Sequence, residues 1–298
     1  MPSRATLVGL ALAGWAALVL AGCGTGGSAG GPTDADGRVQ VSASFYPLEY
    51  AVTKVGGDHV TVTTLTKPGV EPHDLELTSQ DVAGLHNAAM VVYLAGLQPA
   101  VDTAVSQQAS RTGFDVAPAA HLEDAGNDRH FWLDPQRLAA VGTAIGERLA
   151  QLDPAHAADY RANAAALATE LGDLDTAYRT GLASCSNRQL VTSHAAFGYL
   201  AKRYGFTQVP IAGLSPEQEP SAKALADVTA TVRDTKATTI YAETLVDTRY
   251  AETIARSTGA TLAVLDPVEG LTPSTAGSSY PEIMRANLAT LRAGQGCS

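Results

Sequence analysis

The sequence predicts an α/β fold of two lobes, each a mostly parallel β-sheet flanked by helices, joined by one long rigid α-helix. Three observations support this prediction. Short apolar runs alternate with helical patterns in two separate blocks, as in parallel sheets covered by helices. The stretch between the blocks, 154–183, has apolar residues at helical spacing and no strand-like run. The chain of 298 residues also exceeds one ordinary core, so we expect lobes at 39–153 and 184–298.

The N-terminus has the pattern of an exported protein. An apolar run, 5–22, follows Arg4 and ends at Cys23. The letters LAGC, which end at Cys23, resemble the lipobox of bacterial lipoproteins and imply a signal peptide at 1–22 and a lipid on Cys23. The stretch 23–38 is rich in glycine, lacks a basic stop-transfer cluster and is expected to be a flexible tether. An uncleaved anchor helix is the alternative. Either arrangement holds the folded part at the outer face of the bacterial cell membrane.

The first block begins with four expected strands, which lie within 38–47, 59–66, 89–94 and 113–118. A helix then begins at Asp134 and Pro135, because aspartate is a favoured N-cap and proline suits the first helical position. This helix is expected to continue to Leu152. It completes the first lobe.

The linking segment 154–183 is expected to be one helix. Its apolar positions recur every three or four residues, at Tyr160, Ala164, Leu167, Leu171, Leu174 and Tyr178. At 1.5 Å per residue such a helix runs about 40 Å, which is long enough to bridge two lobes.

The second block repeats the plan of the first. Strands are expected at 188–192, 207–211, 238–243 and 261–266. The intervening helices are expected at 194–204, 221–235 and 247–258, and a last helix from Pro281.

Charge and cysteine content restrict the partners and the compartment. The net charge of −10 argues against a nucleic-acid partner. Cys185 and Cys297 are expected to form a disulfide in an oxidising compartment. A metal site is the other interpretation of paired cysteines, but the pair lacks a C-x-x-C spacing.

Four residues able to bind a metal lie at expected strand ends or helix entrances, where ligands of open parallel sheets gather. His73 lies in the loop after the second strand, His130 precedes the Asp134 helix, His194 follows the strand at 188–192, and Asp266 ends the last strand. Three imidazoles and one carboxylate form a complete tetrahedral set for Zn²⁺. Positions alone do not establish that the four side chains meet.

Five successive motifs strengthen this hypothesis: PGVEPHDLELTSQDV, HFWLDPQ, LVTSHAAFGYLAKRYGF, GLSPEQEPSAKALADV and LAVLDPVEGL. In this order they resemble the zinc/manganese-binding lipoproteins of ABC uptake systems, the cluster A-I metal solute-binding proteins. The resemblance runs from about Val39 to Leu291. It implies two lobes joined by a long helix, with the metal in the cleft between them. It also implies that His73, His130 and His194 are ligands and that Asp266 supplies the fourth position.

The choice of metal depends on two features. A long histidine-rich insertion, frequent in zinc-dedicated members of that family, is missing before His130, which keeps Mn²⁺ as an alternative. His194 stands where manganese-specific relatives tend to have glutamate. A third imidazole favours the softer Zn²⁺, which we therefore expect.

Further polar residues have supporting roles in this hypothesis. Asp74, Glu71 and Glu243 are candidates for orienting a ligand or replacing one. His121, Glu123 and Asp124 could form a capture loop at the mouth of the cleft, although acidic loops are usually only solvated.

The function predicted from these features is binding rather than catalysis. We expect a lipid-anchored, monomeric receptor that captures Zn²⁺ and delivers it to an ABC transporter permease. One alternative is a zinc-dependent hydrolase, which would need an open metal position and a general base. Another is a surface adhesin stabilised by its metal, in which chelation would unfold the protein.

Overall fold

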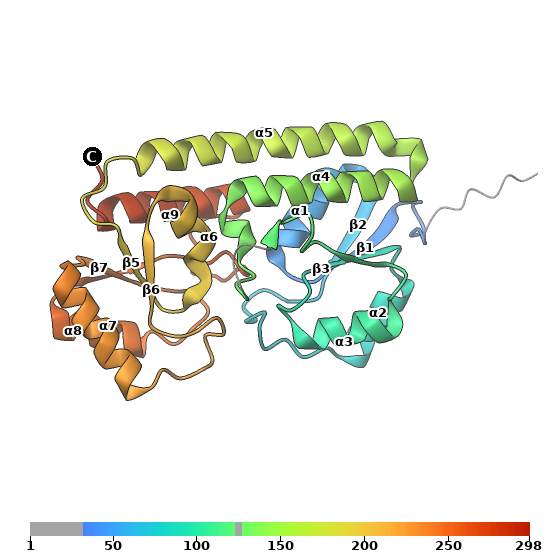
Figure 1. The fold of residues 1–298 in the computed structure, drawn as a ribbon. Helices are drawn as coiled ribbons and strands as arrows, with labels where there is room; N and C mark the ends of the chain where they lie inside the picture. Colours follow the sequence, from blue (N-terminus) through green and yellow to red (C-terminus); the bar gives the residue numbers. More distant parts are fainter. Residues whose placement is uncertain (1–31, 123–126) are drawn as a thin grey trace, which may run out of the picture.

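The computed structural model describes residues 32–122 and 127–298 and has two α/β lobes under one long helix (Figure 1). Each lobe holds one four-stranded sheet, and all paired strands within the sheets are parallel. The strand orders are β2-β1-β3-β4 and β6-β5-β7-β8, which is the same order in both lobes. The predicted fold class is therefore confirmed. The predicted signal peptide and Cys23 lie outside the described residues.

The first sheet consists of β1 (Val39–Ala43), β2 (Val60–Thr64), β3 (Met90–Tyr93) and β4 (Gly113–Asp115). Its helices are α1 (Tyr46–Gly56), α2 (Ser79–Asn87) and α3 (Pro99–Gln108). The strand expected at 38–47 is too long, because Phe45 is already the N-cap of α1 and Pro47 lies in its first turn. Thr78 begins α2 with a reciprocal capping box to Asp81, which ends the long loop that carries His73.

Two antiparallel helices, α4 (Pro135–Leu152) and α5 (Ala157–Gly181), follow the first sheet. Asp134 caps α4 as predicted, since its side chain accepts from the backbone of Gln136. A 3-10 turn over Pro154–His156 replaces the predicted start of the long helix. The 25 residues of α5 give a length of about 37 Å, and the helix runs along both lobes (Figure 1).

The second sheet consists of β5 (Gln189–Thr192), β6 (Thr207–Pro210), β7 (Thr239–Ala242) and β8 (Thr261–Val264). Its helices are α6 (Gly198–Tyr204), α7 (Ala222–Thr235), α8 (Arg249–Thr258) and α9 (Tyr280–Gly294). α9 packs beneath α5, and its near neighbour along α5 is the N-terminal end of α4 (Figure 1). Cys185 and Cys297 form the predicted disulfide, which ties the C-terminus to the start of this lobe.

The largest hydrophobic cluster is continuous through both lobes. It contains Phe45 and Trp132 of the first lobe, Tyr178 of α5, and Phe197 and Tyr280 of the second. The predicted apolar stripe of α5 is buried in it, from Tyr160 to Tyr178. A shared core of this kind resists hinge motion between the lobes. Because one core runs through both lobes, it marks no boundary between them, and the domain limits at 153 and 184 stay a prediction.

Polar contacts join the lobes as well. Arg203 of α6 contacts Asp134 at the start of α4 and Asp175 of α5. The Trp132 indole donates to the carbonyl oxygen of Pro267, 2.8 Å away in the other lobe. These contacts lie next to the segments that carry His130 and His194, so they fix the distance between the two sides of the site.

The described residues contain no helix long and apolar enough to cross a membrane.

Candidate metal centre

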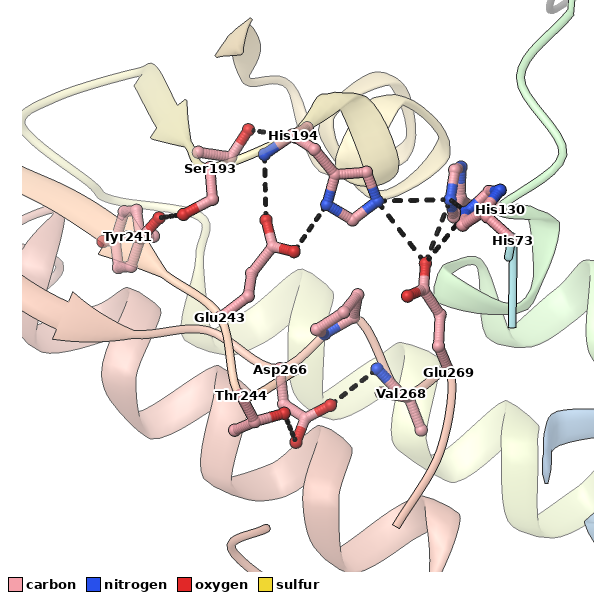
Figure 2. Close-up of polar contacts among 12 residues, drawn as sticks. His73, His130, Ser193, His194, Tyr241, Glu243, Thr244, Asp266, Val268 and Glu269 are labelled. Carbon is pink, nitrogen blue, oxygen red and sulfur yellow. Dashed lines mark hydrogen bonds and ion pairs between the residues drawn. The ribbon is translucent and has the colours of Figure 1, made fainter. Parts of the chain in front are cut away.

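Four potential metal ligands converge between the lobes: His73, His130, His194 and Glu269 (Figure 2). One ligand atom from each lies within 4.8 Å of all the others. The Nε2 atoms of His73 and His130 are 3.1 Å apart, and those of His130 and His194 are 3.4 Å apart. Glu269 Oε1 lies 3.0 Å from Nε2 of His130, 3.5 Å from that of His194 and 3.7 Å from that of His73.

These separations fit a single zinc ion. A tetrahedron with metal–ligand distances of 2.0–2.1 Å has edges of about 3.3 Å. Five of the six donor–donor distances range from 3.0 to 3.7 Å around that value, and the sixth, between His73 and His194, is within 4.8 Å. The donor set of three nitrogens and one carboxylate oxygen is also one that Zn²⁺ accepts.

The three histidines come from different positions in the two lobes. His194 directly follows β5 after Ser193, and His73 lies in the loop between β2 and α2. His130 is the N-cap of a 3-10 turn, Phe131–Leu133, that leads into α4. The strand order reverses beside β1 and beside β5, where open parallel sheets bind ligands at the carboxyl ends of their strands.

Carboxylates behind two of the rings set their orientation. Asp128 Oδ1 lies 2.8 Å from Nδ1 of His130 and also accepts from its backbone N–H. Glu243 contacts Nδ1 of His194 with one oxygen and accepts from the His194 backbone N–H with the other, at 3.0 Å. Each contact places a proton on Nδ1 and leaves Nε2 directed at the centre of the group. Among the described residues, none supports His73 in this way.

Burial and charge prepare the site for a cation. Glu269 is 1% exposed, and neither carboxylate oxygen has a hydrogen bond in the described structure. Burial acts to raise the pKa of Glu269, but the imidazoles of His130, His194 and His73 outweigh it and hold the pKa well below its ordinary value. A buried carboxylate without hydrogen bonds needs a bound cation or ion pairing to offset its desolvation.

The pKa values of the two buried histidines, His130 and His194, are raised. Burial disfavours the charged form of His130, yet the neighbouring carboxylates of Asp128 and Glu269 raise its pKa. Burial acts in the same direction on His194, whose pKa is nevertheless raised well above its ordinary value by Glu243 and Glu269. The raised pKa values mean that protons compete with an incoming metal for these two rings more strongly than for free histidine.

The prediction of Asp266 as the fourth ligand does not agree with the structure. Its carboxylate faces away from the histidines, accepting from the Val268 backbone at 2.7 Å and from the Thr244 hydroxyl at 3.3 Å (Figure 2). Asp266 ends the expected strand at 261–266, but the chain turns after Pro267 and brings Glu269 to the candidate ligand position. The sequence signal for Glu269 was a second carboxylate in the motif LDPVEG, three residues after Asp266.

The remaining candidates lie around the group. Glu243 contacts the backbone and the ring of His194. Glu71 accepts from the Asp74 backbone at 3.1 Å, and burial together with the Glu269 charge raises its pKa to about 8. Sequence reasoning assigned Asp128 no orienting role, although its position two residues before a candidate histidine was a usable signal.

The proposed capture loop gains no support as a second site. His121 is exposed and is not part of the four-residue group, and its carbonyl oxygen accepts from Arg137. Glu123 and Asp124 lie outside the described residues. A cavity of about 610 Å³ does lead to the site, lined by His73, His130 and residues of both lobes.

Two α/β lobes that share one core, with three histidines and a glutamate between them, define a two-lobed metal-binding protein. The family described as zinc-uptake complex component A, periplasmic (ZnuA), matches residues 41–294, and the chain belongs to this family. It is a family of extracytoplasmic solute-binding proteins of metal uptake systems and not one of enzymes.

Individual relatives agree with this assignment. The high-affinity zinc uptake system protein ZnuA of Bacillus subtilis (strain 168) is 32% identical over 92% of this chain and 93% of its own length. The zinc-binding protein AdcA of Streptococcus pyogenes serotype M6 is 35% identical over 87% of this chain. The match covers 56% of AdcA, so the chain spans little more than half of that relative.

Solved structures share the fold. The laminin-binding protein Lbp of Streptococcus pyogenes has a TM-score of 0.78 at 32% identity, covering 87% of this chain and 100% of its own. The Zn(II)-bound ZnuA-like domain of Streptococcus pneumoniae AdcA has a TM-score of 0.76 at 33% identity, covering 87% and 99%.

Proposed function

We propose that this protein captures Zn²⁺ between its lobes with His73, His130, His194 and Glu269 and delivers it to an ABC transporter permease. The observation that carries the proposal is that five of the six donor–donor distances, at 3.0–3.7 Å, lie around the tetrahedral value for zinc. Relatives named as zinc uptake and zinc-binding proteins support the same cargo.

Binding without catalysis follows from the completeness of the donor set. A catalytic zinc keeps one position for water or substrate beside a general base. Here four side chains supply four donors, and the nearby carboxylates of Asp128 and Glu243 are engaged in holding His130 and His194. The arrangement supports a receptor over the zinc-dependent hydrolase.

The metal is proposed to be cargo and not a structural element. The core shared by the lobes consists of apolar side chains and does not depend on the four ligands. We therefore expect the metal-free protein to remain folded after chelation, with a lower melting temperature. Unfolding upon chelation at room temperature would instead favour a metal-stabilised adhesin. Structural relatives described as laminin-binding proteins are the reason to measure unfolding with and without a chelator.

Attachment and release complete the proposal. A lipid on Cys23 would hold the monomeric receptor close to its permease, and a relative named as a zinc-binding lipoprotein supports this anchor. Because the shared core resists hinge motion, we propose that the permease releases the metal by displacing the loop that carries His73, the least supported ligand.

Elemental analysis and competitive titration of the purified protein test the proposal. We expect one Zn²⁺ per chain, and a nanomolar dissociation constant would correspond to about 12 kcal/mol of binding free energy. His130→Ala should weaken binding by about a hundredfold, if four ligands share that free energy equally. His86→Ala, which changes an exposed histidine of α2, is the matched control and should bind normally. Unchanged affinity in His130→Ala would refute the site.

A further inference from the structure

The backbone immediately before Glu269 is strained. Val268 has a φ of +58° and is fully buried. Three non-glycine residues of the described chain have positive φ, and Val268 is the only β-branched one among them. A β-branched residue in the left-handed region is a conformational outlier that persists only where its surroundings enforce it.

Asp266 enforces this conformation from within the turn. Its Oδ1 accepts the Val268 backbone N–H at 2.7 Å, and its Oδ2 accepts the Thr244 hydroxyl at 3.3 Å. Asn287 of α9 fixes Asp266 in turn: its side chain accepts from the Asp266 N–H at 2.9 Å and donates to the Asp266 carbonyl at 2.7 Å. Figure 2 shows the Asp266 carboxylate between Thr244 and Val268, on the side away from the histidines.

The first lobe holds the other side of the turn. The carbonyl oxygen of Pro267 accepts from the Trp132 indole at 2.8 Å. Trp132 lies two residues after His130, so the same segment carries a ligand and restrains the loop of Glu269. The position of Glu269 is therefore determined relative to both lobes.

The left-handed residue decides where Glu269 points. An extended Val268 would continue the direction of β8 and send the next side chain elsewhere. With the observed turn, Glu269 Oε1 comes within 3.0–3.7 Å of three imidazole nitrogens. We propose that Asp266 is a positioning residue: it holds Val268 in the left-handed conformation and thereby places Glu269 on the metal. This inference rests on the proposed zinc function.

A pair of Asp266 variants separates positioning from ligation. Asp266→Asn keeps an oxygen that can accept the Val268 N–H, whereas Asp266→Ala removes it. A positioning role predicts Zn²⁺ affinity within about threefold of wild type for Asp266→Asn. It predicts a loss of about 10- to 100-fold for Asp266→Ala, as for other groups that orient ligands. A metal-ligating role predicts a large loss in both, because a neutral amide is a poor replacement for a carboxylate ligand.

The absorption spectrum of the Co²⁺-loaded protein supplies a second readout. Wild type and Asp266→Asn should show the same intense tetrahedral bands. Asp266→Ala should show weaker bands, because water replaces a displaced Glu269. Glu269→Gln is the comparison variant for a lost ligand. Equal spectra and affinities in wild type and Asp266→Ala would overturn the inference, and so would a loss in Asp266→Asn that equals that of Glu269→Gln.

Two variants of Val268 test the strained conformation directly. Both Val268→Gly and Val268→Ala remove the two buried γ-methyl groups, so they differ only in Cβ. At an ordinary position alanine is the more stabilising of the two, but at positive φ glycine is preferred. We expect Val268→Gly to have the higher melting temperature and the higher Zn²⁺ affinity. The opposite order in both measurements would overturn the left-handed turn.

The experiment also distinguishes this inference from the proposed function. Absence of Zn²⁺ binding by the wild-type protein would overturn the function and the inference together. Normal binding by the wild type, weak binding by Glu269→Gln and normal binding by Asp266→Ala would overturn the inference alone.

Discussion

Acidification should weaken Zn²⁺ binding near neutral pH, earlier than free histidine would predict. Zinc binds neutral imidazole, so every proton on a ligand competes with it. The pKa values of His130 and His194 are both raised in the metal-free site, although burial opposes their charge, because carboxylates contact both rings. Competition therefore begins above the ordinary histidine pKa of about 6.5.

The direction and the size of the change in Zn²⁺ affinity follow from the number of protons that the metal displaces. Above the raised pKa values both rings are neutral and the affinity does not depend on their protonation. As the pH falls through these values, each displaced proton weakens binding by up to tenfold per pH unit, or about 1.4 kcal/mol. Two rings give a limit of about a hundredfold per unit. The two rings repel each other when both are charged. We therefore expect the affinity to fall by between about tenfold and a hundredfold per pH unit.

The assay is competitive titration against a chelator of known pH dependence, between about pH 8 and about pH 6. Calorimetry in two buffers of different ionisation enthalpy counts the released protons independently. Glu269→Gln is the control, because it removes the carboxylate that both rings contact and should lower the number of protons released. A constant affinity over this range, without proton release, would refute the electrostatic description of the site.

Three further predictions concern the ligands, the metal and the disulfide. His73→Ala should weaken Zn²⁺ binding less than His130→Ala in chelator competition, because His73 is less buried and lacks an orienting carboxylate among the described residues; an equal loss would contradict this ranking. Zn²⁺ should displace Mn²⁺ completely at equal concentrations, as measured by elemental analysis, because three imidazoles favour the softer ion; retained Mn²⁺ would reverse the preference. Replacing Cys185 and Cys297 by alanine should cost about 4 kcal/mol of unfolding free energy in a denaturant titration, because the bond closes a long loop. Zn²⁺ affinity should stay unchanged, and a fall in affinity with unchanged stability would contradict this separation.

The rigid connection between the lobes limits how the metal can leave. A shared apolar core, the Trp132 contact with Pro267 and the ion pairs of Arg203 hold His130, His194 and Glu269 in one frame. The segment with His73 is a long loop between β2 and α2, and it faces the cavity that opens to solvent. We therefore expect capture and release to depend most on His73, which these contacts between the lobes do not restrain.

The fold class and three of the four candidate ligands could be predicted from the sequence. Alternating strand and helix patterns predicted both sheets, because each segment must bury its own apolar face. Asp134 and Pro135 set the start of α4 through local capping, and the apolar stripe from Tyr160 to Tyr178 identified the linking helix. Three histidines could be predicted because the carboxyl ends of parallel strands place following residues at one edge.

The fourth candidate ligand and the residues that hold the group in place follow from the folded structure. Asp266 and Glu269 lie three positions apart, and by our inference the choice between them depends on the backbone of Val268. That conformation is enforced by Asp266 together with Asn287 and Trp132, which are remote in sequence. Sequence patterns report local preferences, whereas the hydrogen bonds of Asn287 and Trp132 that hold Asp266 and Pro267 come from residues remote in sequence.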